Sequence, residues 1–167
     1  MAITVEQLQM WLDARENEHL EFKEARSRYE FDDLVRYCVA LANERGGHLI
    51  LGVRDALPRR VVGSDAFPEL ERTKAGLFER LHLRVDAEAV QHPGGRVVVF
   101  SIPSRPVGSP IEYKGAYWMR SGEALVPMTA DRLKAIFDEG AADFSAEICT
   151  SASMSDLDPN AIDHFRR

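Results

Sequence analysis

The sequence predicts an α+β domain with a mixed β-sheet at its centre, β-hairpins, and three to four helices packed against the sheet. Three observations carry this prediction. Segments with helical periodicity alternate with strand-like segments, short glycine turns join strand-like segments into hairpins, and 45% of the 167 residues are hydrophobic, enough to fill a core. The chain has the size of one main domain, which we expect to span residues 1–140.

The first two elements are expected to be a helix and a short strand. Thr4 followed by Gln7 is a capping-box pattern, and it predicts a helix that ends near Arg15. Residues 19–23 alternate polar with apolar side chains, which is typical of a half-buried strand.

The next two elements are expected to be a longer helix and a buried strand. Asp32 or Asp33 is predicted to cap the helix, and Gly46 to supply the left-handed residue that ends it. The apolar run at 48–55 is typical of a central strand covered on both faces, with Asp55 at its carboxyl end.

The second half of the chain is expected to add hairpins and two further helices. The predicted elements are a helix at 68–81, a hairpin of 85–91 with 96–102, a hairpin of 111–113 with 116–120, and a helix beginning at Thr129. Residues 141–167 are predicted to be a linker and the start of a helix cut short by the end of the chain, so we expect this chain to be the N-terminal part of a longer protein.

Composition narrows the classes of function. A net charge of −6 and a pI near 5.4 argue against a protein that coats nucleic acid through a wholly positive surface, so any such contact must be local or assisted by metal ions. No apolar run is long enough to span a bilayer, and we expect a cytoplasmic protein with no membrane partner. Cys38 and Cys149 lack the spacing of a zinc site or a disulfide framework.

Glu16, Glu18, Glu21 and Glu24 crowd into nine residues, and two interpretations stay open. Such a cluster is most often a solvated acidic face. The sharper interpretation starts from Glu21 and Lys23, which share one face of a strand, as carboxylate and lysine do in two-metal nucleases.

In that sharper interpretation, further carboxylates converge on one metal ion. Glu16 at a helix exit and Asp55 at a strand end are the candidates, with Mg²⁺ or Mn²⁺ as the cofactor because hard cations favour oxygen ligands. Lys23 would orient the attacking water or offset charge on the phosphate. Each carboxylate has a plain alternative: Glu16 as helix termination and Asp55 as a strand-ending turn residue.

Basic and aromatic residues alternate on the second hairpin. Lys114, Tyr117 and Arg120 are expected to contact phosphates or stack on an unpaired base, and the Arg59-Arg60 pair to hold phosphates. Core packing is the alternative for at least one of the hairpin aromatics, Tyr117 and Trp118.

Several ordered blocks together resemble the Schlafen-type AlbA-like domain over roughly residues 10 to 140. The blocks are Glu16-x4-Glu21-Phe22-Lys23, Cys38 to Asn43 with Gly46-Gly47, Leu49 to Val53-x-Asp55 with Gly63 after it, and Tyr117 to Gly122. The resemblance implies an AlbA-like lobe. In Schlafen ribonucleases three carboxylates make a metal-dependent cut in transfer or ribosomal RNA, and these positions fall on Glu16, Glu21 and Asp55.

The resemblance leaves three functions open. The first is a nucleic-acid-binding domain that acts as a divalent-metal-dependent endoribonuclease on structured RNA such as tRNA. Because bacterial members are mostly described as putative DNA-binding proteins or transcriptional regulators, the second is a non-enzymatic DNA-binding module. The third is a dimerisation module that positions a downstream effector. Schlafen nucleases pair two lobes, whereas this chain has one, so a homodimer is expected.

Overall fold

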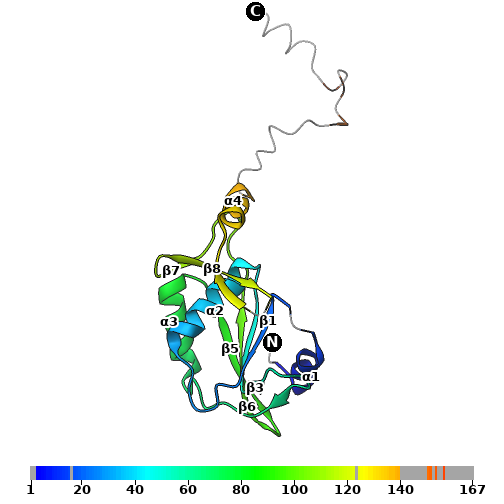
Figure 1. Ribbon diagram of the computed structural model, residues 1–167, viewed down its shortest axis with the longest axis vertical. Coiled ribbons are helices and arrows are strands. Elements are labelled where there is room, and N and C mark those ends of the chain that lie inside the picture. The colour runs from blue at the N-terminus through cyan, green and yellow to red at the C-terminus, as the bar shows by residue number, and fades with distance from the viewer. Residues whose placement is uncertain are drawn as a thin grey trace, which may run out of the picture.

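A four-stranded mixed sheet forms the centre of the structure (Figure 1). Its strand order is β1 (Leu20–Lys23), β2 (Gly47–Leu51), β6 (Gly95–Ile102) and β5 (Asp86–His92). β1 runs parallel to β2, whereas β6 is antiparallel to both of its neighbours. The computed structural model describes residues 3–15, 17–122 and 124–139, with positions 150, 151, 153 and 156.

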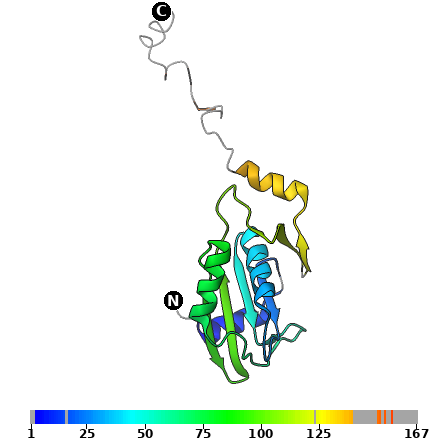
Figure 2. The same ribbon diagram turned by 90° about the vertical axis from the view of Figure 1, so that its left-hand side faces the viewer.

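Helices cover both faces of this sheet. α2 (Phe31–Asn43) and α3 (Leu70–Leu81) lie on one face and α1 (Val5–Asp13) on the other, as Figures 1 and 2 show from two sides. α4 (Ala130–Asp138) lies beyond one end of the sheet (Figure 1). We refer to the two covered faces as the α2 face and the α1 face.

Strand alternation divides the apolar core into two layers. The α2 face is packed with Leu49, Leu51, Val98 and Phe100 against α2 and α3. The α1 face is packed with a second set: Leu8, Leu12, Leu20, Phe22, Ile50, Val53, Val90, Val97 and Val99. Because both faces are buried, β2 and β6 read as continuous apolar runs.

Two small ribbons extend the sheet region. β3 (Val53–Arg54) pairs with β4 (Arg60–Val61), and β7 (Glu112–Tyr113), β8 (Ala116–Ser121) and β9 (Ala124–Pro127) form a three-stranded ribbon. The buried Asn43 ties this second ribbon to the end of α2. Its Nδ2 donates to Ile111 O at 3.0 Å and Trp118 O at 2.9 Å, and its Oδ1 accepts from Ile111 N at 2.8 Å.

The α+β class is confirmed, with local corrections. Glu30 is the N-cap of α2, and its side chain makes no capping hydrogen bond. Asp32 and Asp33 lie inside the first turn, where the positive end of the helix dipole stabilises their negative charge. The strand predicted at 48–55 is divided at Gly52, whose φ is +94° and where an added Cβ would lie 2.8 Å from Arg96 O. β4 and β9 were not predicted.

Most of the C-terminal segment lies outside the residues that the structure describes. The linker and helix predicted for 141–167 lie outside them, apart from the four isolated positions, and the boundary at residue 140 stays a prediction. Among the described helices, none has the length and apolar character that crossing a membrane requires.

Candidate nucleic-acid interface

β1 sorts its four residues onto two faces. Leu20 and Phe22 enter the core of the α1 face, so Glu21 and Lys23 point to the α2 face. Glu21 is only 4% exposed there. A carboxylate at this depth needs hydrogen bonds and a cationic partner to offset the loss of contact with water.

Two cations hold the Glu21 carboxylate. The Lys23 ammonium pairs with Oε1, and Arg120 Nη1 donates to Oε2. Arg120 is 2% exposed, and its Nε and Nη2 also donate to Gly122 O at 3.3 and 3.1 Å. The guanidinium therefore joins β8 to β1.

Tyr37 of α2 lies beside both cations. Lys23 Nζ is 5.1 Å from the centre of the Tyr37 ring, and Arg120 Cζ is 5.7 Å from it. Burial acts to lower the pKa of Lys23, but hydrogen bonds and charge from Glu21, together with Tyr37, outweigh burial and raise that pKa above its usual value. Lys23 thus stays charged at neutral pH.

A second cation–aromatic pair lies next to the first. Arg36 directly precedes Tyr37 in α2. Its Cζ lies 5.8 Å from the centre of the Trp118 ring, and its guanidinium pairs with Asp33. Trp118 and Arg120 are alternate residues of β8 and share one face of it. Both aromatic rings are partly buried and pack against the core of the α2 face. We call Lys23, Arg36, Tyr37 and Trp118 the basic–aromatic surface.

This surface includes residues that the sequence reasoning missed. The sequence assigns no role to Tyr37 and Arg36. They lie beside the apolar stripe of their helix, and no local pattern shows which residues of other elements lie opposite them.

Burial raises the pKa of the nearby Tyr29, and the charges of Tyr37, Asp33 and Glu21 raise that pKa further, so Tyr29 is a neutral phenol there.

Asp55 belongs to the other face of β1. Its Oδ1 lies 3.8 Å from Arg59 Nε, and the Arg59 guanidinium stacks 4.3 Å from the centre of the Phe22 ring. Arg59 Nη1 also donates to Leu12 O at 3.0 Å and Ala14 O at 2.5 Å, at the end of α1. The guanidinium that Asp55 contacts therefore lies on the α1 face, opposite Glu21.

The described members of the predicted metal site do not fit a shared ion in this arrangement. Both oxygens of Glu21 are held by cations, and Asp55 contacts an arginine on the opposite face. Within the described ranges no three histidine, cysteine or acidic side chains are grouped to hold a metal. Glu16 lies outside the described residues, so the triad as a whole stays a prediction.

The predicted nucleic-acid contacts are separated in space. Lys114 is exposed and pairs with Asp32, and Tyr117 is partly exposed on β8. Arg60 is exposed on β4, at the opposite end of the domain from β7 (Figure 1). Arg59 and Arg120 have their guanidinium groups turned inward, to α1 and to Glu21. These five residues therefore do not form one continuous surface.

The sequence of this region matches a known protein family. Residues 16–129 match the family described as Schlafen, AlbA_2. The chain belongs to the Schlafen AlbA_2 family. The family associates the domain with nucleic acids, and the matched range contains the Glu21 network and the whole basic–aromatic surface.

Solved structures confirm the fold of this Schlafen AlbA_2 domain. The DIP2311 protein from Corynebacterium diphtheriae matches 97% of the chain at a TM-score of 0.62 and 22% identity, and the match spans 37% of that protein. The N-terminal domain of a putative ATP-dependent DNA helicase RecG-related protein from Nitrosomonas europaea matches 78% of the chain and 94% of its own length, at a TM-score of 0.50 and 20% identity. Curated proteins give no match.

Proposed function

We propose that this Schlafen AlbA_2 domain binds nucleic acid by holding unpaired nucleotides on the basic–aromatic surface. The observation that carries the proposal is the pairing of a cation with an aromatic ring twice, side by side, at Lys23 with Tyr37 and at Arg36 with Trp118. The side chains of Lys23 and Arg36 are 32% and 39% exposed, so both cations remain within reach of a ligand.

This combination suits single-stranded nucleic acid. Stacking of a base on an aromatic side chain contributes about 1–3 kcal/mol and tolerates any base, while the adjacent cations attract phosphates. A net charge of −6 disfavours a wholly electrostatic mode, so a local surface that adds stacking to charge fits this chain better. Lys114, in the turn between β7 and β8, extends the same set of contacts in the proposal, whereas Tyr117 lies on the opposite face of β8 from Trp118.

Binding is favoured over metal-dependent cleavage by the state of Glu21. Its carboxylate already has two cationic partners, and a metal ion would have to displace both Lys23 and Arg120. We therefore keep cleavage of structured RNA such as tRNA, through Glu16, Glu21 and Asp55 with Mg²⁺ or Mn²⁺, as the second candidate. A DNA-binding regulator module and a dimerisation module are distinguished from both by experiment.

The proposal is tested with fluorescent single-stranded RNA, single-stranded DNA and duplex DNA in anisotropy titrations. We expect single strands to bind in EDTA, and Tyr37→Leu to weaken binding about tenfold because one stacking ring is lost. Lys134→Gln, a change at an exposed lysine of α4, is the matched control and should leave affinity unchanged. Equal affinity of the Tyr37→Leu variant and the parent protein would refute the proposed surface.

The same samples separate the alternatives. Appearance of RNA fragments only with Mg²⁺ or Mn²⁺, abolished by Glu21→Gln, would support cleavage instead of simple binding. Salt-dependent binding of duplex DNA alone would favour the regulator module. Sedimentation with and without RNA tests the predicted homodimer, and a dimer that binds no nucleic acid would favour the dimerisation module.

A further inference from the structure

A cavity of about 430 Å³ lies where the end of α2 meets the end of α4. It is lined by Arg45, Ser104, Arg105, Val107 and Glu139. Arg45 follows α2, Glu139 follows α4, and the other three belong to the loop after β6. The cavity is separate from the basic–aromatic surface, and none of its lining residues was singled out in the sequence.

Two guanidinium groups in this cavity share one carboxylate oxygen. Arg105 Nη2 donates to Glu139 Oε1 at 2.8 Å, and Arg45 Nη2 lies 3.7 Å from the same atom. Arg105 first, with Arg45 and the Gly108 backbone adding to it, holds the pKa of Glu139 below its usual value. The cavity lining thus carries two positive charges, on Arg45 and Arg105, and one negative charge, on Glu139.

Arg105 is fixed in place but not fully satisfied. It is only 5% exposed, its backbone N–H donates to Ala42 O at 3.0 Å, and its Nη1 donates to Pro106 O at 3.1 Å. Its Nε is buried and has no acceptor within the part of the chain that the structure describes. Nε and Nη2 form one edge of the guanidinium fork, which binds two oxygens of a phosphate in parallel.

We propose that this cavity is a phosphate site and that Glu139 occupies it as an internal substitute in the free protein. The phosphate would accept from Arg105 Nε and Nη2 and pair with Arg45, while the Glu139 carboxylate leaves because two anions cannot share the same donors. The inference rests on the proposed function in one respect, since the phosphate is taken to be a phosphodiester of a bound strand.

The cavity lies close enough to Tyr37 for one nucleic-acid strand to contact both. Tyr37 and Asn43 are six residues apart on α2, which is about 9 Å along the helix axis. Arg45 follows immediately beyond, so a strand stacked on Tyr37 needs to continue by only a few nucleotides to place a phosphate beside Arg45. The cavity would then set the register of the strand, whereas the basic–aromatic surface supplies stacking.

Inorganic phosphate tests the site directly. In a ¹H–¹⁵N spectrum of the arginine side chains, titration with phosphate should shift the Nε–H signal of Arg105. We expect Glu139→Gln to tighten this binding about fivefold and Arg45→Gln to weaken it about fivefold, as removal of one partly exposed charge would do. An Arg105 signal that does not move in the parent protein or in Glu139→Gln overturns the site.

Oligonucleotide binding separates this inference from the proposed function. If Arg45→Gln weakens and Glu139→Gln strengthens binding of single-stranded RNA, the phosphodiester assignment holds. If single strands bind but neither change affects them, the inference fails and the proposed function stands. If phosphate moves the Arg105 signal but no strand binds, the cavity is an anion site and the proposed function fails. Urea unfolding shows whether each variant keeps the stability of the parent protein, so that a change in binding can be assigned to the substituted side chain.

Discussion

The two faces of β1 each bury an arginine, and they neutralise it in different ways. On the α2 face, Arg120 meets the buried carboxylate of Glu21. On the α1 face, Arg59 meets two backbone carbonyls, the Phe22 ring and Asp55, whose side chain is 42% exposed. The difference predicts that loss of Arg120 leaves the Glu21 carboxylate buried beside one cation fewer, while loss of Arg59 leaves the carbonyls of Leu12 and Ala14 without this donor.

The largest effect is therefore expected for Arg120→Met. Breaking a buried ion pair by removing one partner costs about 3–5 kcal/mol, and Lys23, which stays beside Glu21, should keep the loss near the lower end. Urea unfolding at neutral pH measures the free energy of unfolding. The double variant Glu21→Gln with Arg120→Met should recover part of the loss, and a double variant as unstable as the single one would contradict the stranded-charge explanation.

A smaller loss is expected for Arg59→Met on the opposite face. Hydrogen bonds to charged groups contribute about 1.5–3 kcal/mol, and the methionine would retain the apolar contact with Phe22 while leaving Leu12 O and Ala14 O without a donor. Hydrogen exchange should speed up in the last turn of α1 more than elsewhere. The neighbouring exposed Arg60→Met is the control, with a change within about 0.5 kcal/mol.

Most of the fold could be predicted because its determinants are local. Thr4 and Thr129 cap the helices that follow them, accepting from the N–H groups of Gln7 and Arg132. The turn before Gly95 closes the β5–β6 hairpin as its sequence indicates. β9 was missed because its four residues carry no strand pattern of their own, and they pair with β8 only through tertiary context.

Much less of the site could be predicted, because its partners are distant in the sequence. Glu21 with Lys23 was found from strand alternation, but Arg120 lies 99 residues from Glu21, and only the fold shows that it is turned inward. Tyr37 and Arg36 became visible only once β8 was placed beside α2. A local pattern predicts which face a residue lies on but not which residues from other elements meet it there.

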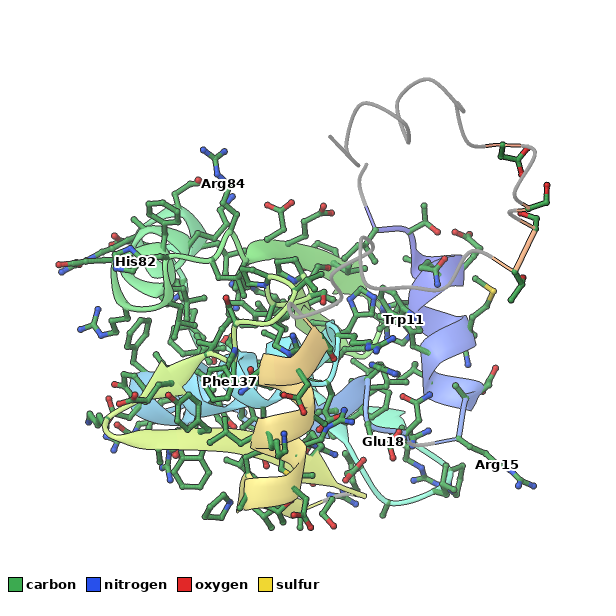
Figure 3. The ribbon with its side chains drawn as sticks, turned by 90° about the horizontal axis from the view of Figure 1, so that it is seen from above. Trp11, Arg15, Glu18, His82, Arg84 and Phe137 are labelled. Carbon is green, nitrogen blue, oxygen red and sulfur yellow. The ribbon has the colours of Figure 1, made fainter. Side chains whose placement is uncertain are left out.

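The two faces should also differ in their response to pH. On the α1 face, the half-buried His48 stacks on Trp11, which is directed from α1 toward the sheet while Arg15 points away (Figure 3). Burial lowers the pKa of His48 below its usual 6.5, so the unfolded chain takes up a proton first as pH falls. The free energy of unfolding should therefore decline as the pH falls from about 7.5 through 6.5, the usual pKa of the histidine in the unfolded chain.

Urea midpoints across that range measure this decline, and His48→Gln should reduce it because the titrating group is gone. His82, which lies exposed beyond α3 at the far side of the domain from Trp11 (Figure 3), offers the matched control, His82→Gln. A decline that is equally steep in both variants would assign the pH dependence to other groups.

The smallest effect is expected for Asp55→Asn, and it separates the two carboxylates most sharply. Arg59 is buried, but the Asp55 side chain is 42% exposed and its Oδ1 lies 3.8 Å from Arg59 Nε, beyond hydrogen-bond distance, so we expect a loss of about 1 kcal/mol. Glu21→Gln should be clearly more destabilising, because Lys23 and Arg120 would lose the buried negative charge between them. Equal losses in urea unfolding would mean that the two faces of β1 are electrostatically alike, and the reason for placing binding ahead of cleavage would be lost with that result.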